Sequence, residues 1–166
     1  MIIILMGVSG SGKTSIGTEL ASHLDGKFFD GDDFHPAENV EKMKSGIPLD
    51  DADRAPWLNI IHNHMVQCQN DGLTAVIACS ALKNSYRDQL AAGETSSAIF
   101  VYLKGSYELI LSRMQARANH FFKADMLKTQ FNALEEPSQN EAIIVDINQS
   151  PNEVVEAIIS QLNKNS

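Results

Sequence analysis

The chain has 166 residues, of which 43% are hydrophobic, 20% charged and 7% aromatic, as is typical of a globular protein. We expect a single domain over residues 1–166, because a chain of this length has room for one core and a lid but not for two full domains. Its 13 basic and 21 acidic side chains give a net charge of −8. This charge argues against nucleic-acid and anionic-membrane partners, which attract clustered lysine and arginine.

The two cysteines and the start of the chain indicate a compartment. Cys68 and Cys79 stand in apolar stretches without metal-ligand spacing, so we expect both to be small buried thiols. The apolar start MIIILMG lacks a basic n-region, and no apolar run approaches the roughly 18 residues of a membrane span. We therefore expect a cytoplasmic protein.

Short apolar runs alternate with stretches of helical period along the chain, which is the pattern of βαβ units. Strands are predicted over residues 2–6, 27–30, 74–79, 98–103 and 142–145. Helices are predicted over residues 13–24, from about Trp57 to Gly72, and from Pro151 onward. The predicted fold class is therefore α/β, with a five-stranded, mainly parallel sheet flanked by helices.

Two segments have distinctive local signals. The last helix begins with a capping box, in which Ser150 is the N-cap, Pro151 the first residue and Glu153 the third. Residues 113–137 interrupt the alternation of strands and helices, so we expect a helical lid there.

Residues 7–14, GVSGSGKT, match the phosphate-binding pattern G-x-x-x-x-G-K-[ST]. A predicted strand precedes them and a predicted helix follows, as a P-loop requires, so that backbone N–H groups and the helix N-terminus face a phosphate. We expect Lys13 to bridge the β- and γ-phosphates of ATP and the Thr14 hydroxyl to ligate Mg²⁺. The expected nucleotide-binding residues of this loop are Gly7, Ser9, Gly10, Ser11, Gly12, Lys13, Thr14 and Ser15.

The carboxylate for Mg²⁺ is expected after the second strand, because the third strand, TAVIAC, ends without an acidic residue. Side chains two apart on an extended segment share a face, so Asp30 and Asp32 are predicted to face the phosphates and Asp33 to point away. We assign Asp30 to the Mg²⁺ shell and Asp32 to the acceptor hydroxyl, as a base or an orienting group. A solvated acidic turn is the alternative.

Basic residues near the same sheet edge indicate an anionic substrate. Asp53 is expected to cap the next helix with Pro56 in its first turn, where the cation of Arg54 opposes the helix dipole and so needs a ligand. Lys83 and Arg87, four residues apart after the third strand, are predicted to join Arg54 in a pocket for a carboxylate. Surface solvation is the alternative for one such cation.

The predicted lid carries a second pair of cations. Arg113 and Arg117 are also four residues apart and are expected over the nucleotide phosphates, where Arg117 stabilises charge on the transferring group. His120 follows on the same side. A solvated helix face is the alternative for the two arginines.

These stretches together resemble the gluconate kinases of the P-loop kinase group. The matching segments are MGVSGSGKT (6–14), DGDDFHP (30–36), NVEKMKSGIPLDDADRAPWL (39–58), CSALKNSYRD (79–88), FVYLKGS (100–106), HFFKADMLKTQFNALEEP (120–137) and VDINQSP (145–151). The resemblance implies a fold like that of shikimate and adenylate kinases with a mobile lid, and a homodimer. It also implies transfer of a phosphoryl group from ATP to the 6-hydroxyl of D-gluconate. The substrate contacts it implies are Asp32, His35, Arg54, Lys83, Arg87 and His120.

Two other functions remain open on the residues alone. A kinase of another small hydroxy acid, such as shikimate, would share the scaffold and differ in a few pocket contacts. A non-catalytic nucleotide-binding regulator would also keep the P-loop, although such a module has less need of Asp32 and the lid arginines.

Overall fold

The computed structural model describes residues 1–93, 97–117 and 124–164. In these parts of the chain five strands form one sheet in the order β2-β3-β1-β4-β5, and every neighbouring pair is parallel. The strands are β1 (Ile2–Met6), β2 (Lys27–Asp30), β3 (Ala75–Ala78), β4 (Ala98–Lys104) and β5 (Ile143–Asp146). The predicted class and all five strands are confirmed, and no strand end differs from its predicted position by more than one residue.

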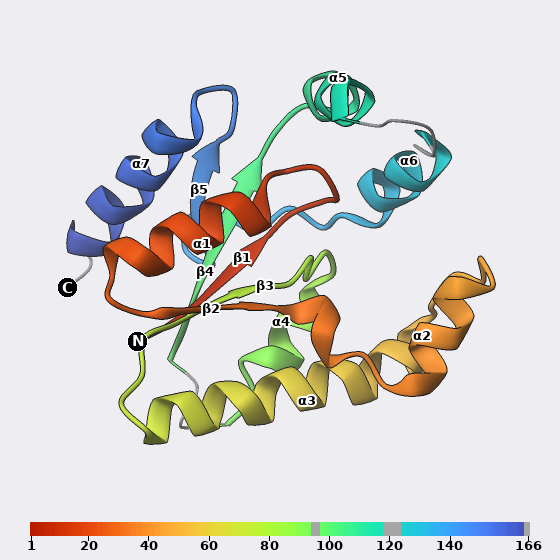
Figure 1. Ribbon diagram of the computed structural model, residues 1–166, viewed down its shortest axis with the longest axis horizontal. Helices are drawn as coiled ribbons and strands as arrows, with labels where there is room; N and C mark the ends of the chain where they lie inside the picture. Colours follow the sequence, from red (N-terminus) through yellow and green to blue (C-terminus); the bar gives the residue numbers. More distant parts are fainter. Residues whose placement is uncertain (94–96, 118–123, 165–166) are drawn as a thin grey trace.

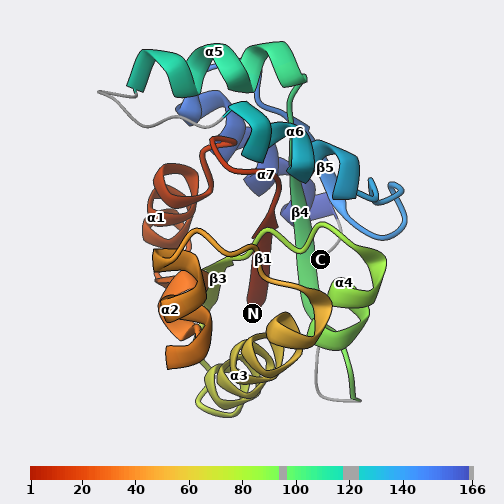
Figure 2. The same cartoon turned by 90° about the vertical axis from the view of Figure 1, so that its right-hand side faces the viewer.

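Helices cover both faces of this sheet. They are α1 (Lys13–His23), α2 (Ala37–Lys44), α3 (Asp51–Asn70), α4 (Asn84–Leu90), α5 (Tyr107–Arg117), α6 (Ala124–Ala133) and α7 (Pro151–Lys164), with a 3₁₀ helix η1 (Gly31–Phe34) after β2. Figure 1 shows α1 and α7 on one face and α3 and α4 on the other. The helices α2 and α6 extend past the carboxyl ends of the strands, which face the viewer in Figure 2. No helix within the described ranges is long and apolar enough to span a membrane.

The central strand β1 explains why the first apolar run has no polar alternation. Ile3 and Leu5 pack into the cluster that contains α1 and α7, whereas Ile2, Ile4 and Met6 pack into the cluster that contains α3. All five side chains are at most 2% exposed. A strand covered on both faces needs apolar residues at every position, so the strand is the middle of a three-layer core.

The sequence predicted the N-cap residues of two helices, α7 and α3, and the two predictions have different outcomes. The capping box of α7 is confirmed, since the Ser150 N–H donates to Glu153 Oε2 over 2.8 Å. The predicted cap of α3 is wrong. Asp50 is the N-cap, because its Oδ1 accepts from the Asp53 N–H (2.8 Å) while Asp53 Oδ2 accepts from the Asp50 N–H (3.0 Å). The helix therefore begins earlier than expected, and Pro56 lies inside it.

Candidate functional site

A cleft of about 810 Å³ opens at the carboxyl ends of β1, β2 and β3. Such a position is where open parallel sheets bind ligands. The predicted site residues that line it are Ser9, Gly10, Gly12, Lys13, Thr14, Ser15, Asp30, Asp32, His35, Arg54 and Arg117. Segments that are far apart in the sequence, from the first loop to α6, thus share one cavity.

The loop between β1 and α1 has the backbone of a phosphate cradle. Gly10 has φ +78° and Gly12 has φ +95°, in the left-handed region that side-chain-bearing residues rarely adopt. A Cβ at Gly10 would lie 2.5 Å from Cγ of Met114 in α5, so this position also has no room for a side chain. Gly12 is the N-cap of α1 and offers no side-chain oxygen. The first N–H groups of α1 are therefore available to an anion.

Lys13 lies in the same loop. Its Nζ donates to the carbonyl oxygens of Gly7 (2.9 Å) and Val8 (3.0 Å). Burial lowers the pKa of the Lys13 ammonium, and the negative charges of Asp32 and Asp30 oppose this shift. A phosphate placed beside Lys13 would favour the charged ammonium still more, so the site is electrostatically suited to a polyanion.

The segment after β2 is a 3₁₀ turn, which contradicts the extended backbone used to predict its side-chain directions. Asp30 Oδ1 accepts from the Asp32 N–H over 3.0 Å and thereby caps η1. This local bond competes with an extended conformation, as aspartate side chains often do. Asp30 and Asp32 both line the cleft, whereas Asp33 is exposed outside it.

His35 lies between the acidic turn and α3. Its ring stacks on Trp57 with centroids 4.2 Å apart and planes at 16°, and its Nε2 is 3.8 Å from Asp32 Oδ1. The Trp57 indole N–H donates to the Gly31 carbonyl over 2.7 Å. This hydrogen bond holds the indole ring in the position in which His35 stacks on it. Burial lowers the pKa of His35; Asp32 opposes the shift and Arg54 adds to it.

The three cations expected to bind a carboxylate do not form one group. Arg54 lines the cleft and donates to the Tyr86 hydroxyl over 3.3 Å. Lys83 is not a lining residue, and its Nζ pairs with Asp51 over 3.0 Å.

Arg87 differs most from its expected position. It is 5% exposed and is not among the lining residues. Its guanidinium donates to the carbonyl oxygens of Ala81 (2.9 Å), Leu82 (3.3 Å) and Glu135 (3.0 Å), which joins the loop after β3 to the segment after α6. A spacing of four residues indicates a shared face only when both residues are helical, and here Lys83 is the extended N-cap residue of α4. Arg87 therefore turns inward while Lys83 stays partly exposed.

The two arginines of the expected lid also separate. Arg117 lines the cleft, whereas Arg113 Nη2 donates to the Ile147 carbonyl in the loop after β5 over 2.7 Å. Both belong to α5, which begins at Tyr107 and buries Ile110 in the core. His120 lies outside the described residues.

Gln130 of α6 makes a contact that sequence reasoning missed. Its Oε1 accepts from the Ser9 N–H over 2.7 Å, and its Nε2 donates to Ser9 Oγ over 2.8 Å. The helix α6 is thereby joined to the tip of the P-loop. No sequence signal pointed to this pair, because a glutamine in a helix is usually a solvated residue and the two residues are 121 positions apart.

The donor set at the strand ends fits Mg²⁺. Thr14 and Asp30 both line the cleft and carry side-chain oxygen atoms that could ligate the ion. The described residues contain no cluster of three or more His, Cys, Asp or Glu side chains able to hold a metal. Mg²⁺ is typically bound by one or two protein oxygens together with phosphates and water, and the Thr14 and Asp30 oxygens could fill that role.

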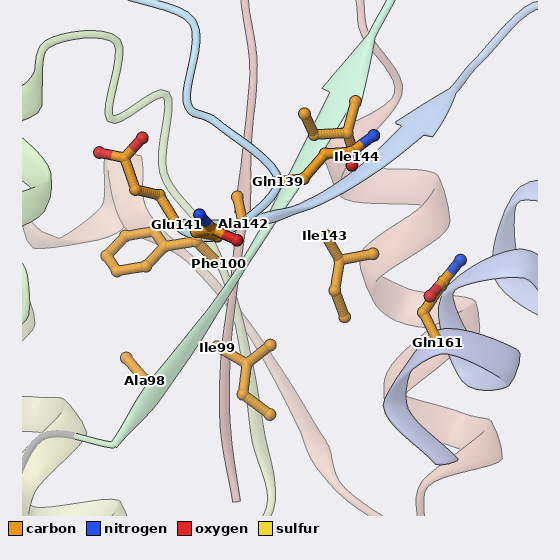
Figure 3. Close-up of a pocket in the computed structure, with 10 residues that line it drawn as sticks. Ala98, Ile99, Phe100, Gln139, Glu141, Ala142, Ile143, Ile144 and Gln161 are labelled. Carbon is orange, nitrogen blue, oxygen red and sulfur yellow. The ribbon is translucent and has the colours of Figure 1, made fainter. Parts of the chain in front are cut away.

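A second cavity, of about 400 Å³, lies at the opposite ends of β4 and β5 (Figure 3). It is lined by the start of both strands, by residues 139–142 and by Gln161, and among these described lining residues Glu141 alone is charged. Among the described residues that line it there is neither a P-loop residue nor a cation, so we assign phosphoryl transfer to the first cleft.

Comparison with known proteins places this geometry in a family. A family model described as shikimate kinase matches residues 9–163. The thermoresistant gluconokinase of Escherichia coli is 46% identical over 98% of this chain and 94% of its own length. A gluconokinase of Gluconobacter oxydans is 44% identical over 95% of this chain and 88% of its own length.

Solved structures agree with the sequence relatives. The crystal structure of a gluconokinase from Sinorhizobium meliloti has a TM-score of 0.88 at 40% identity, covering 98% of this chain and 91% of that one. Shikimate kinase from Aquifex aeolicus has a TM-score of 0.60 at 18% identity over 99% and 98%, which shows a shared fold. With a P-loop at the centre of its cleft and gluconokinase relatives along nearly its whole length, the chain belongs to the gluconokinase family of P-loop kinases.

Proposed function

We propose that this kinase transfers the γ-phosphoryl group of ATP to the 6-hydroxyl of D-gluconate, giving 6-phospho-D-gluconate and ADP. The observation that carries the proposal is the cleft itself, in which a P-loop, the acidic turn and Arg54 line one cavity. The names of the gluconokinase relatives support gluconate as the acceptor substrate.

The donor side of the cleft holds the nucleotide. The loop amides and the N-terminus of α1 bind the phosphates, and Lys13 places its ammonium against the β- and γ-phosphates. Thr14 and Asp30 would hold Mg²⁺, which neutralises charge on the phosphate oxygens. Arg117 approaches the same space from α5 and stabilises negative charge on the transferring group.

The acceptor side orients the sugar acid. Asp32 accepts a hydrogen bond from the acceptor hydroxyl. It either takes the proton as a base or only orients the hydroxyl. Arg54 is the carboxylate ligand that the lining of the cleft favours, because Lys83 is paired with Asp51 and Arg87 is bound to backbone carbonyls. His120 is a further substrate contact on the ground of the resemblance.

We also propose that residues 113–137 act as a lid that closes over both ligands. Exposed apolar side chains lie on two sides of the cleft, with exposed fractions of 44–51%. They are Met43 in α2, Ile47 just after α2, and Met126 in α6. Closure would bury this apolar surface and exclude water, which otherwise competes with the sugar hydroxyl for the phosphoryl group.

The proposed setting is a cytoplasmic homodimer. Cys68 and Cys79 are buried and form no disulfide with each other. This is compatible with a reducing compartment. The homodimer rests on the family resemblance, and light scattering on the purified protein measures it directly.

One substrate panel tests the function. ATP consumption is measured with gluconate, shikimate, glucose and sorbitol, with and without Mg²⁺, and Lys13→Ala protein serves as the inactive control. We expect turnover with gluconate that requires Mg²⁺. Preference for shikimate, which the family model raises as the second candidate, would replace the substrate, and no turnover with any acid would leave a nucleotide-binding regulator.

A further inference from the structure

Asn39 of α2 is a buried polar residue that the proposed function does not use. It is 3% exposed. Its Nδ2 donates to the backbone carbonyl of Asp53 over 2.9 Å and lies 3.2 Å from Nδ1 of His35. A buried amide with two partners is costly to disturb, so its orientation constrains both neighbours.

The orientation of the Asn39 amide follows from its partner in α3. A backbone carbonyl oxygen can only accept a hydrogen bond, so the NH₂ end of the amide must face Asp53. The same nitrogen carries a second hydrogen, and His35 Nδ1 is the other atom within reach. The amide thus presents a donor to the imidazole.

This donor decides which nitrogen of the imidazole carries the hydrogen. A neutral imidazole has one donor and one acceptor nitrogen. Because Nδ1 accepts from Asn39, the hydrogen must be on Nε2. A turn of the ring by 180° would keep its stack on Trp57, but it would place the carbon Cδ2 in the position of Nδ1. The hydrogen bond with Asn39 would then be lost, so this hydrogen bond favours the observed orientation.

We infer that Asn39 is a positioning residue that holds His35 as the Nε2–H tautomer, making the imidazole a fixed hydrogen-bond donor on the acceptor side of the cleft. His35 Nε2 is 3.8 Å from Asp32 Oδ1, too far for a direct hydrogen bond and close enough for both groups to meet one ligand oxygen. Asp32 accepts and His35 donates, a complementary pair for a polyhydroxy acid. This last step rests on the proposed function.

The charged groups around His35 favour the neutral ring. Arg54 from α3 disfavours a second cation, and burial acts in the same direction. Asp32 from η1 acts the other way but is solvent-exposed, with 85% of its side chain accessible. A second hydrogen on Nδ1 would also point at the Asn39 amide hydrogen, so protonation would break that contact.

The tautomer can be measured without any ligand. Long-range ¹H–¹⁵N correlation spectra of the full-length ¹⁵N-labelled protein distinguish a hydrogen-bearing from a bare ring nitrogen, and a His35→Gln sample identifies the signals among the five histidines. We expect His35 to carry its hydrogen on Nε2 near neutral pH. A hydrogen on Nδ1 would overturn the inference even if no Asn39 variant folds.

Two variants separate positioning from loosening of α2. Asn39→Asp replaces the donor with an acceptor, so Nδ1 of His35 should gain a hydrogen, by a change of tautomer or by protonation of the ring. In either case kcat/KM for gluconate should fall about 10-fold or more while KM for ATP stays unchanged. Lys42→Met is the matched control, because it removes the other tie between α2 and Asp53, at 2.7 Å, without touching His35. It should keep the Nε2–H tautomer.

The outcomes separate this inference from the proposed function. An unchanged tautomer in folded Asn39→Asp, or the same change in Lys42→Met, would overturn the positioning role. An Nε2–H tautomer that reverses in Asn39→Asp, in a protein that does not phosphorylate gluconate, would support the tautomer assignment and overturn the substrate.

Discussion

The two sides of the cleft are built in different ways. The donor side is centred on one contiguous stretch, residues 7–15, whose shape follows from glycine backbone angles and the start of α1, and only Asp30 and Arg117 are added to it from other elements. The acceptor side is assembled from η1, α2 and α3, whose residues meet only through contacts such as Trp57 with Gly31 and Asn39 with Asp53. One side therefore depends on local conformation and the other on packing.

This difference has a consequence for mutations. A change on the donor side should act on phosphate binding and leave the acceptor side in place, because the hydrogen bonds of this loop with other elements, such as Ser9 with Gln130 of α6, do not involve η1, α2 or α3. A change on the acceptor side should spread, since each residue there is held by partners on another element. The expected effects below run from the donor side outward, from the largest to the smallest.

Lys13→Ala should abolish measurable turnover while the protein stays folded, because the lost cation neutralises charge on the β- and γ-phosphates. Steady-state kinetics together with circular dichroism test both halves of this expectation. A folded variant with near-normal kcat would contradict the assignment of the P-loop as the donor site.

Asp32→Asn should lower kcat by about 10² or more with a smaller change in KM for ATP, since base catalysis typically contributes 10²- to 10⁴-fold. Asp33→Asn is the matched control, because Asp33 is exposed and lies outside the lining of the cleft. Greater damage from the control than from Asp32→Asn would mean that η1 turns differently when substrate binds.

Arg54→Ala should raise KM for gluconate by about 10- to 100-fold, as a charge-assisted hydrogen bond contributes roughly 1.5 to 3 kcal/mol. KM for ATP should barely move. Lys83→Ala, which removes a cation already paired with Asp51, should change KM for gluconate much less. Equal effects of the two changes would show that Lys83 binds gluconate as Arg54 does.

Arg87→Ala should act on stability and not on substrate affinity. Its guanidinium satisfies three backbone carbonyls in a nearly buried position. Leaving such groups unpaired costs about 2 kcal/mol or more, which lowers Tm by roughly 4 to 8 °C for a chain of this size. A normal Tm with a large rise in KM for gluconate would show instead that Arg87 binds the substrate.

Cys79 should give the smallest effect, confined to alkaline pH. Burial raises the pKa of this thiol to about 12 from an ordinary value of 9.0. The folded state therefore keeps a proton that the unfolded state loses between these values, so stability falls as pH rises through that window. Denaturant unfolding at pH 9 and above should show a smaller loss in Cys79→Ala than in the unchanged protein, and equal losses would place the thiol in contact with water.

The strands, the α7 cap and the P-loop could be predicted because their signals are local. A continuous apolar run such as Ile2–Met6 indicates a strand covered on both faces, and the spacing of Ser150 and Glu153 defines a capping box without reference to other elements. The P-loop glycines could be read from the sequence because glycine, which has no Cβ, adopts the positive φ angles that this loop requires. Residue type and spacing were sufficient for these features.

The contacts of the acceptor side and of its neighbouring elements could not be predicted in the same way. Helical spacing places Lys83 near Arg87 but does not say that Arg87 turns toward the Ala81 carbonyl, and the count of aspartates does not say that Asp30 caps a 3₁₀ turn. Asn39 and Gln130 gave no signal at all, because each is defined by a partner on a distant element. Residue order decides which groups are available, and the packing of α2, α3 and α6 decides which of them meet, because a hydrogen bond needs two atoms within about 3 Å and no local pattern encodes that distance.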